Sequence, residues 1–154
     1  MRFSIDTSAI LDGWTRYYPR EAFPGLWQHL GELIESGHLR ASEEVRYELA
    51  KKEDEALEWA ERQDGLFVPI DDDIQDAVSA ILSDHPRLID TRRGRSGADP
   101  FVIALAKVWR CAVVTGERPS GSLKRPKIPD VCSALGVASM SLLDLIRQQG
   151  WVFR

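Results

Sequence analysis

Hydrophobic positions along this chain follow two alternating patterns. Short apolar runs of β type predict strands at Arg2–Asp6, His38–Ala41, Leu66–Ile70, Ala112–Thr115 and Val137–Ser139. Between them, apolar residues recur at intervals of three and four, which predicts helices over Phe23–Glu35, Asp71–Leu82 and Ala98–Trp109. Strands that alternate with helices indicate an α/β fold built on a parallel sheet.

Polar residues mark where two further helices begin. Ser42 is expected to be an N-cap, because Glu43 and Glu44 follow it in the first turn, where the helix dipole favours acids. The stretch "SLLD" at Ser141–Asp144 predicts a capping box for the last helix. Together the elements predict a single domain over residues 1–154, with a central parallel sheet of about five strands flanked by helices.

Composition narrows the class of protein. The 154 residues are 44% hydrophobic and 29% charged, values typical of a globular domain, and no apolar run is long enough to suggest a membrane span. We recognise no signal peptide, so we expect a cytoplasmic protein in which Cys111 and Cys132 stay reduced. The net charge of −4 is uneven, since residues 90–130 hold nine Lys and Arg against four Asp and Glu. One basic stretch in an acidic protein can still contact a polyanion.

The predicted topology brings five acids to one edge of the sheet. A helix that follows a strand, or precedes the next parallel strand, begins at the carboxyl edge of the sheet. That edge should therefore hold Asp6, Glu48, Asp99, Glu117 and Asp130. Each acid also has an ordinary interpretation. Asp6 or Asp99 could cap a helix, Glu48 could be solvated, Glu117 could be a turn residue, and Asp130 could face a helix dipole.

The set as a whole favours a metal site over these separate interpretations. Carboxylates crowded on one edge repel one another, and some would protonate unless a cation compensates their charge. Hard divalent cations prefer oxygen ligands, so Mg²⁺ or Mn²⁺ is the expected cofactor. Ser8 and Thr115 could orient the ligands or a water molecule.

Four motifs in order resemble the PIN domain: "FSIDTSAIL", "EEVRYELAKK", "GADPFVIALA" and "AVVTGE". The resemblance covers nearly the whole chain and implies a PIN-like three-layer fold. It also implies a metal-dependent nuclease whose catalytic acids are Asp6, Glu48, Asp99 and Glu117. Glu117 stands where the family usually has aspartate, and "KIPDVC" is similar to a feature of a less characterised PIN-like subgroup. The fourth position therefore stays open: Glu117, Asp130 or both could bind the metal.

Many small bacterial PIN domains are toxins of toxin–antitoxin pairs. The resemblance accordingly implies an endoribonuclease that hydrolyses RNA phosphodiester bonds, with an antitoxin protein as a partner; a homodimer is left open. Two basic loops adjoin the acids and could hold the RNA backbone. The residues expected to do so are Arg92, Arg93, Arg95, Lys124, Arg125 and Lys127.

Other classes of function remain open on the sequence alone. "DTSAI" is similar to the metal-adhesion motif of von Willebrand A-type domains, although Ile10 replaces its last serine. A haloacid-dehalogenase-type phosphatase would have aspartate where Ser8 stands. A catalytically silent PIN fold, or another metal-dependent protein-binding module, is the alternative to a nuclease.

Overall fold

The computed structural model describes residues 2–89 and 97–153. Its strands are β1 (Phe3–Ile5), β2 (Leu39–Ser42), β3 (Phe67–Val68), β4 (Ala112–Val114) and β5 (Ser139–Met140). Its α-helices are α1 (Thr7–Asp12), α2 (Pro24–Glu35), α3 (Glu43–Lys52), α4 (Asp54–Glu61), α5 (Asp72–Asp84), α6 (Asp99–Trp109), α7 (Ile128–Leu135) and α8 (Leu142–Gln149). A π-helical turn, Gly13–Tyr17, extends α1, and a short 3₁₀ helix, Pro86–Leu88, follows α5.

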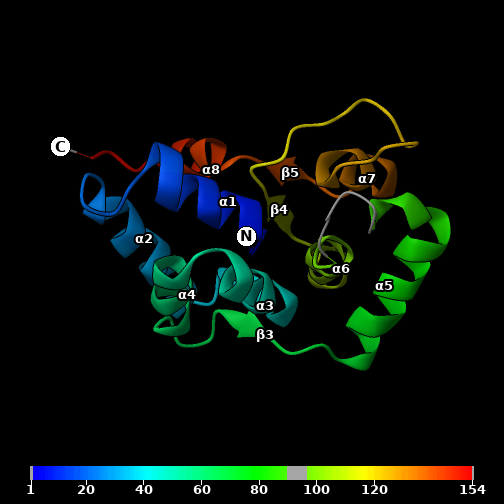
Figure 1. Ribbon diagram of the computed structural model, residues 1–154, viewed down its shortest axis with the longest axis horizontal. Helices are drawn as coiled ribbons and strands as arrows, with labels where there is room; N and C mark the ends of the chain where they lie inside the picture. Colours follow the sequence, from blue (N-terminus) through cyan, green and yellow to red (C-terminus); the bar gives the residue numbers. More distant parts are fainter. Residues whose placement is uncertain (1, 90–96, 154) are drawn as a thin grey trace.

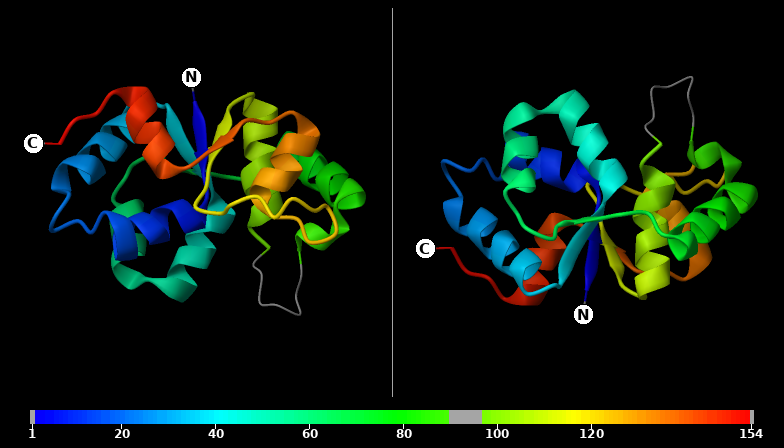
Figure 2. Two further views of the ribbon diagram at one scale, coloured as in Figure 1. Left: turned by 90° about the horizontal axis from the view of Figure 1, so that it is seen from above. Right: turned by 90° about the horizontal axis from the view of Figure 1, so that it is seen from below.

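The sheet confirms the predicted fold class. Its strand order is β3-β2-β1-β4-β5, and every described pairing is parallel. Figure 1 shows helices α1, α2, α4 and α8 on one side of the sheet and α5, α6 and α7 on the other, and Figure 2 shows the same layers from above and below. The chain therefore forms a three-layer α/β/α domain. Among the described residues, no helix is long and apolar enough to cross a membrane.

The central strand is buried on both faces. Phe3 and Ile5 lie in the core, as their apolar character predicts. Ser4, on the opposite face, is also fully buried. Its hydroxyl donates a 2.8 Å hydrogen bond to the Val102 carbonyl of α6. This bond satisfies the polar group that would otherwise oppose burial of β1 beneath α6.

Helix starts agree with the polar signals in the sequence. Ser42 accepts a hydrogen bond from the Glu44 amide, and Asp71 accepts one from the Ile74 amide. Ser141 and Asp144 form the predicted capping box of α8. The fifth strand lies two residues later than its predicted start, at Ser139–Met140. Gly136 ends α7 in the left-handed conformation, and Val137 then donates to the Cys132 carbonyl, so the chain enters the sheet only after this closing turn.

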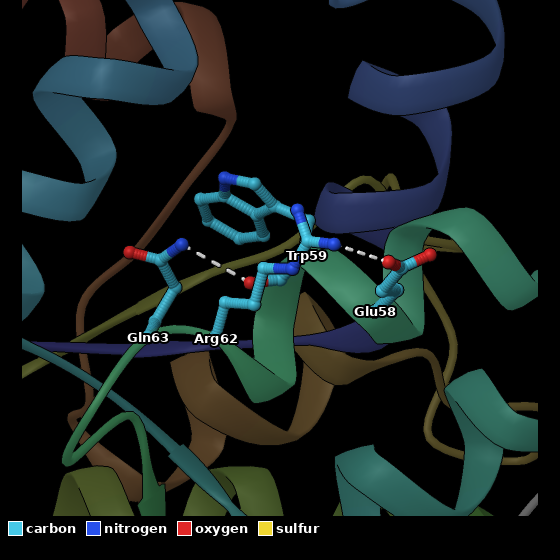
Figure 3. Close-up of polar contacts among 4 residues, drawn as sticks. All are labelled: Glu58, Trp59, Arg62 and Gln63. Carbon is cyan, nitrogen blue, oxygen red and sulfur yellow. Dashed lines mark hydrogen bonds and ion pairs between the residues drawn. The ribbon is translucent and has the colours of Figure 1, made fainter.

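A cluster of tryptophans fixes α4 against the N-terminal helices. The Trp27 ring lies 4.8 Å from that of Trp14 and 4.9 Å from that of Trp59, both edge to face. Figure 3 shows Trp59 on α4, with Gln63 donating to its carbonyl and Arg62 paired with Glu58. Trp27 is a core residue, only 2% exposed.

Candidate functional site

Four of the five predicted acids line one cleft at the carboxyl edge of the sheet. The cleft has a volume of about 300 Å³, and its walls include Asp6, Glu48, Asp99 and Glu117. Asp6 follows β1 and Glu117 lies beyond β4, whereas Glu48 and Asp99 come from α3 and α6. The sheet order reverses at β1 and β4, where open α/β sheets place their ligand sites. Residues up to 111 positions apart in the chain thus meet as the topology predicts.

Asp6 holds the N-cap position of α1 but its side chain does not cap that helix. Its backbone is extended, with φ −88° and ψ 153°, and its carboxylate makes no capping bond to the helix amides. Instead, Asp6 Oδ2 accepts hydrogen bonds from Ser8 Oγ at 2.5 Å and from Thr115 Oγ1 at 3.0 Å. The side chain is 2% exposed. The carboxylate therefore makes no side-chain capping hydrogen bond. Burial raises the pKa of Asp6, although the backbone amides of Thr7 and Ser8 still act to lower it, and the Asp6 backbone begins the helix.

Ser8 and Thr115 join the start of α1 to the loop after β4. Their hydroxyl oxygens lie 3.2 Å apart, and both contact Asp6. The Gly116 amide donates to Ser8 Oγ at 2.8 Å, and the Glu117 amide donates to Thr115 Oγ1 at 3.1 Å. The two hydroxyls that the sequence placed near the acids thus fix both Asp6 and the backbone that carries Glu117.

Thr7 orients Glu48 on the opposite wall. Thr7 Oγ1 donates a 2.5 Å hydrogen bond to Glu48 Oε1, and both side chains are buried. Glu48 is therefore not the solvated helix residue that its position in α3 would also have allowed.

Asp99 is the first residue of helix α6 and not its N-cap. Ala98 is the N-cap and makes no side-chain capping bond, so Asp99 is the first helical residue and Pro100 the second. This corrects the interpretation of Asp99 as the N-cap. The Asp99 side chain is 9% exposed and lines the cleft, at the positive end of the helix dipole.

Of the two acids left open by the sequence, Glu117 lines the cleft, and its Oε2 accepts a hydrogen bond from the Ile128 amide at 3.3 Å. Asp130 is not among the residues that line the cleft. Its carboxylate accepts hydrogen bonds from the amides of Ser120, Gly121 and Lys127, which organise the loop before α7. Burial raises the pKa of Asp130, but these amide bonds outweigh it and leave the pKa below its usual value.

Burial sets the electrostatics of the two innermost acids. It raises the pKa of Asp6 above its usual value, and the bonds from Ser8 and Thr115 only partly offset this effect. It likewise raises the pKa of Glu48, with the hydrogen bond from Thr7 opposing the shift and the nearby charge of Asp6 adding to it. Two buried carboxylates that disfavour their charged forms are stabilised by a cation placed between them.

The donor set of the cleft fits a hard divalent cation. In the described part of the chain, no three acidic, histidine or cysteine side chains already stand close enough together to coordinate an ion. The cleft offers carboxylate and hydroxyl oxygens, the type of ligand that hard divalent cations prefer. The residues that would hold it are Asp6, Glu48, Asp99 and Glu117.

The predicted RNA-binding residues are only partly placed. Lys127 lines the cleft, and the Lys124 and Arg125 side chains are exposed on the loop before α7. That loop is held by Ser120, whose hydroxyl donates to the Arg125 carbonyl and to Asp130. Arg92, Arg93 and Arg95 lie outside the described residues.

Two charged residues of the cleft, Lys52 and Asp12, were not predicted from the sequence. Lys52 lies four positions after Glu48 and therefore on the same face of α3, a spacing that could have identified it. Asp12 ends α1, and its Oδ2 would lie 2.5 Å from a Cβ built on Gly116. Nothing local in the sequence signals that contact, because it depends on how closely α1 approaches the loop after β4.

A family model matches nearly the whole chain. The family model described as domain of unknown function DUF4411 matches residues 3–153, nearly the whole chain. No curated protein matches the sequence significantly.

Proposed function

The chain belongs to the family described as domain of unknown function DUF4411, and we propose that it is a metal-dependent endoribonuclease that hydrolyses RNA phosphodiester bonds. The proposal combines the acid-lined cleft with the resemblance of four ordered motifs to the PIN domain. Mg²⁺ or Mn²⁺ is the proposed cofactor.

The side chain of Asp6 carries the proposal. It occupies an N-cap position without a side-chain capping hydrogen bond, is almost fully buried, and shares its cleft with four further carboxylates. A buried carboxylate is costly unless a hydrogen-bonded or charged partner compensates it. Two hydroxyl groups supply part of that compensation, and a bound divalent cation would supply the rest.

Each residue of the cleft has a proposed role. When bound, the metal would activate a water molecule and stabilise charge on the leaving oxygen. Asp6, Glu48, Asp99 and Glu117 would hold it. Ser8 and Thr115 orient the Asp6 carboxylate, and Thr7 orients Glu48 through the 2.5 Å hydrogen bond. These bonds keep one oxygen of each inner carboxylate in a fixed position.

We further propose that the nuclease acts as the toxin of a toxin–antitoxin pair in the cytoplasm. This part rests on the PIN resemblance alone. A short adjacent reading frame that encodes a DNA-binding protein, and whose product abolishes RNA cleavage when mixed with this chain, would support it.

The proposed activity is tested by incubating a mixed RNA pool with the wild-type protein and with Asp6→Asn, each with and without Mg²⁺. Asparagine caps helices about as well as aspartate but lacks the charge that a hard cation requires. We expect the wild type to cleave only with the metal and the variant to be slower by at least about 100-fold, more than outer positioning residues usually cost.

Circular dichroism of both proteins provides the control for folding, because the substitution leaves the size of the side chain unchanged. Cleavage by Asp6→Asn at the wild-type rate would refute the proposed site. Absence of cleavage by a folded, metal-loaded wild type on every RNA tested would instead favour the catalytically silent alternative.

A further inference from the structure

Lys52 brings a positive charge into the acidic cleft from one wall. It is the last residue of α3, one helical turn beyond Glu48, and both side chains line the cleft. The Lys52 side chain is exposed to solvent, whereas Glu48 is buried. The ammonium group can therefore reach the mouth of the cleft while the carboxylate stays at its floor.

Lys127 brings a second positive charge from the other wall. It precedes α7, which leads into β5, whereas α3 follows β2. Strands β1 and β4, which position Asp6 and Glu117, lie between β2 and β5 in the sheet. The two lysines therefore come from elements on opposite sides of the strands that position Asp6 and Glu117.

The charge balance of the cleft makes these lysines important for a polyanion. The cleft is lined by five carboxylates, those of Asp6, Asp12, Glu48, Asp99 and Glu117, and by two lysines. A metal ion would offset only part of this negative charge, so phosphates next to the reacting one need other positive partners.

We propose that Lys52 and Lys127 form a clamp that binds the backbone phosphates on either side of the phosphate to be cleaved. This inference rests on the proposed ribonuclease function and assigns Lys52 a role that the sequence did not suggest. A clamp of two ammonium groups contacts the backbone without reading bases, so it suits single-stranded RNA of any sequence.

Lys52 also has an ordinary structural role, which its neighbour shares. Lys51 and Lys52 both lie in the last turn of α3, where positive charge stabilises the helix dipole. Only Lys52 lines the cleft. The pair therefore separates the two roles, since Lys51→Met and Lys52→Met remove the same charge from the same helix end.

The experiment measures binding of a fluorescein-labelled single-stranded RNA of mixed sequence without divalent ions, across a range of KCl concentrations. Each phosphate contact in a single strand contributes about 0.7 to the slope of log affinity against log salt. We expect Lys52→Met and Lys127→Met each to reduce the slope by about 0.7, and Lys51→Met to leave it near the wild-type value. With Mg²⁺ present, Lys52→Met should raise KM for cleavage and change kcat little, because the clamp binds ground state and transition state alike.

The outcomes distinguish the clamp from the nuclease. If the wild type cleaves RNA but Lys51→Met and Lys52→Met weaken binding equally, the clamp is wrong and the nuclease stands. If the folded wild type neither binds nor cleaves RNA, both are wrong. Equal melting temperatures for Lys51→Met and Lys52→Met would show that the two lysines stabilise the C-terminal end of α3 equally, so a difference in RNA binding would come from the cleft.

Discussion

Gly116 illustrates how a single residue keeps the cleft intact. A Cβ at this position would lie 2.5 Å from Asp12 Oδ2 and 3.0 Å from the Ser8 carbonyl oxygen. The first contact could be relieved by rotating a side chain, but the second is with backbone. The Gly116 amide also donates to Ser8 Oγ, so the loop cannot retreat without breaking the bond that supports Asp6. Glycine is required here by close approach.

Gly116→Ala should therefore reduce stability and activity together. Overpacking of a tight contact typically costs about 1–3 kcal/mol, and we expect a loss in that range for the free energy of unfolding in urea. RNA cleavage should fall as well, because Ser8 and Asp6 move with the loop. Gly97→Ala is the control, since a Cβ there would meet nothing within 4 Å. Equal stability of the two variants would contradict the proposed crowding.

At the scale of elements, the wall of the cleft formed by α3 depends on the packing of the helix after it. Helix α4 follows α3 after one residue, Glu53, and is anchored by Trp59, whose side chain is only 7% exposed. Trp59 packs edge to face on Trp27 of α2. Aromatic pairs of this geometry add to the burial of a large apolar surface. The tryptophan cluster thus holds both helices against the N-terminal part of the domain.

Trp59→Ala should destabilise the protein by about 3–5 kcal/mol, the usual cost of removing a buried aromatic side chain. Urea denaturation followed by circular dichroism measures it. Trp109→Ala is a suitable comparison, because that side chain is half-buried and contacts the Arg2 guanidinium at 5.1 Å. We expect less than half the loss there. Comparable losses would mean that Trp59 does not anchor α4.

At the scale of the whole molecule, the sheet order brings together acids that oppose folding when no cation is bound. Burial raises the pKa of Asp6 from 3.8 and that of Glu48 from 4.5. The folded protein therefore binds these protons more tightly than the unfolded chain does. The free energy of unfolding that these two protonated acids contribute is therefore fully present below their pKa values in the unfolded chain. It is lost as the pH rises through their higher pKa values in the folded protein.

Melting in EDTA should thus show wild-type stability falling as the pH rises above the unfolded values of 3.8 and 4.5, more steeply than that of Asp6→Asn. At pH 7, Mg²⁺ at about 100 times its dissociation constant should restore about 2.7 kcal/mol to the wild type. In a domain of this size that corresponds to roughly 5–10 °C. The variant should gain less. Identical pH profiles for both proteins would show that Asp6 does not contribute to the repulsion.

Much of the fold was predictable because its signals are local. Apolar periodicity located five strands and the main helices, and Ser42, Asp71 and Ser141 marked helix starts with side chains that contact amides two or three residues away. Strand alternation with helices then implied a parallel sheet, and that topology brought Asp6, Glu48, Asp99 and Glu117 to one edge. Local patterns suffice where the relevant contacts are short in sequence.

What each acid does at that edge was decided only by the tertiary structure. The sequence could not distinguish a capping Asp6 from one held by Thr115, because the Thr115 hydroxyl reaches it across 109 positions of chain. It could not choose between Glu117 and Asp130. The Asp130 carboxylate accepts hydrogen bonds from the amides of Ser120 and Gly121, and these amides reach it only because the loop folds back. Asp12 entered the cleft for the same reason. Side-chain roles at a site depend on distances between distant segments, and the order of residues fixes those distances only through the packed fold.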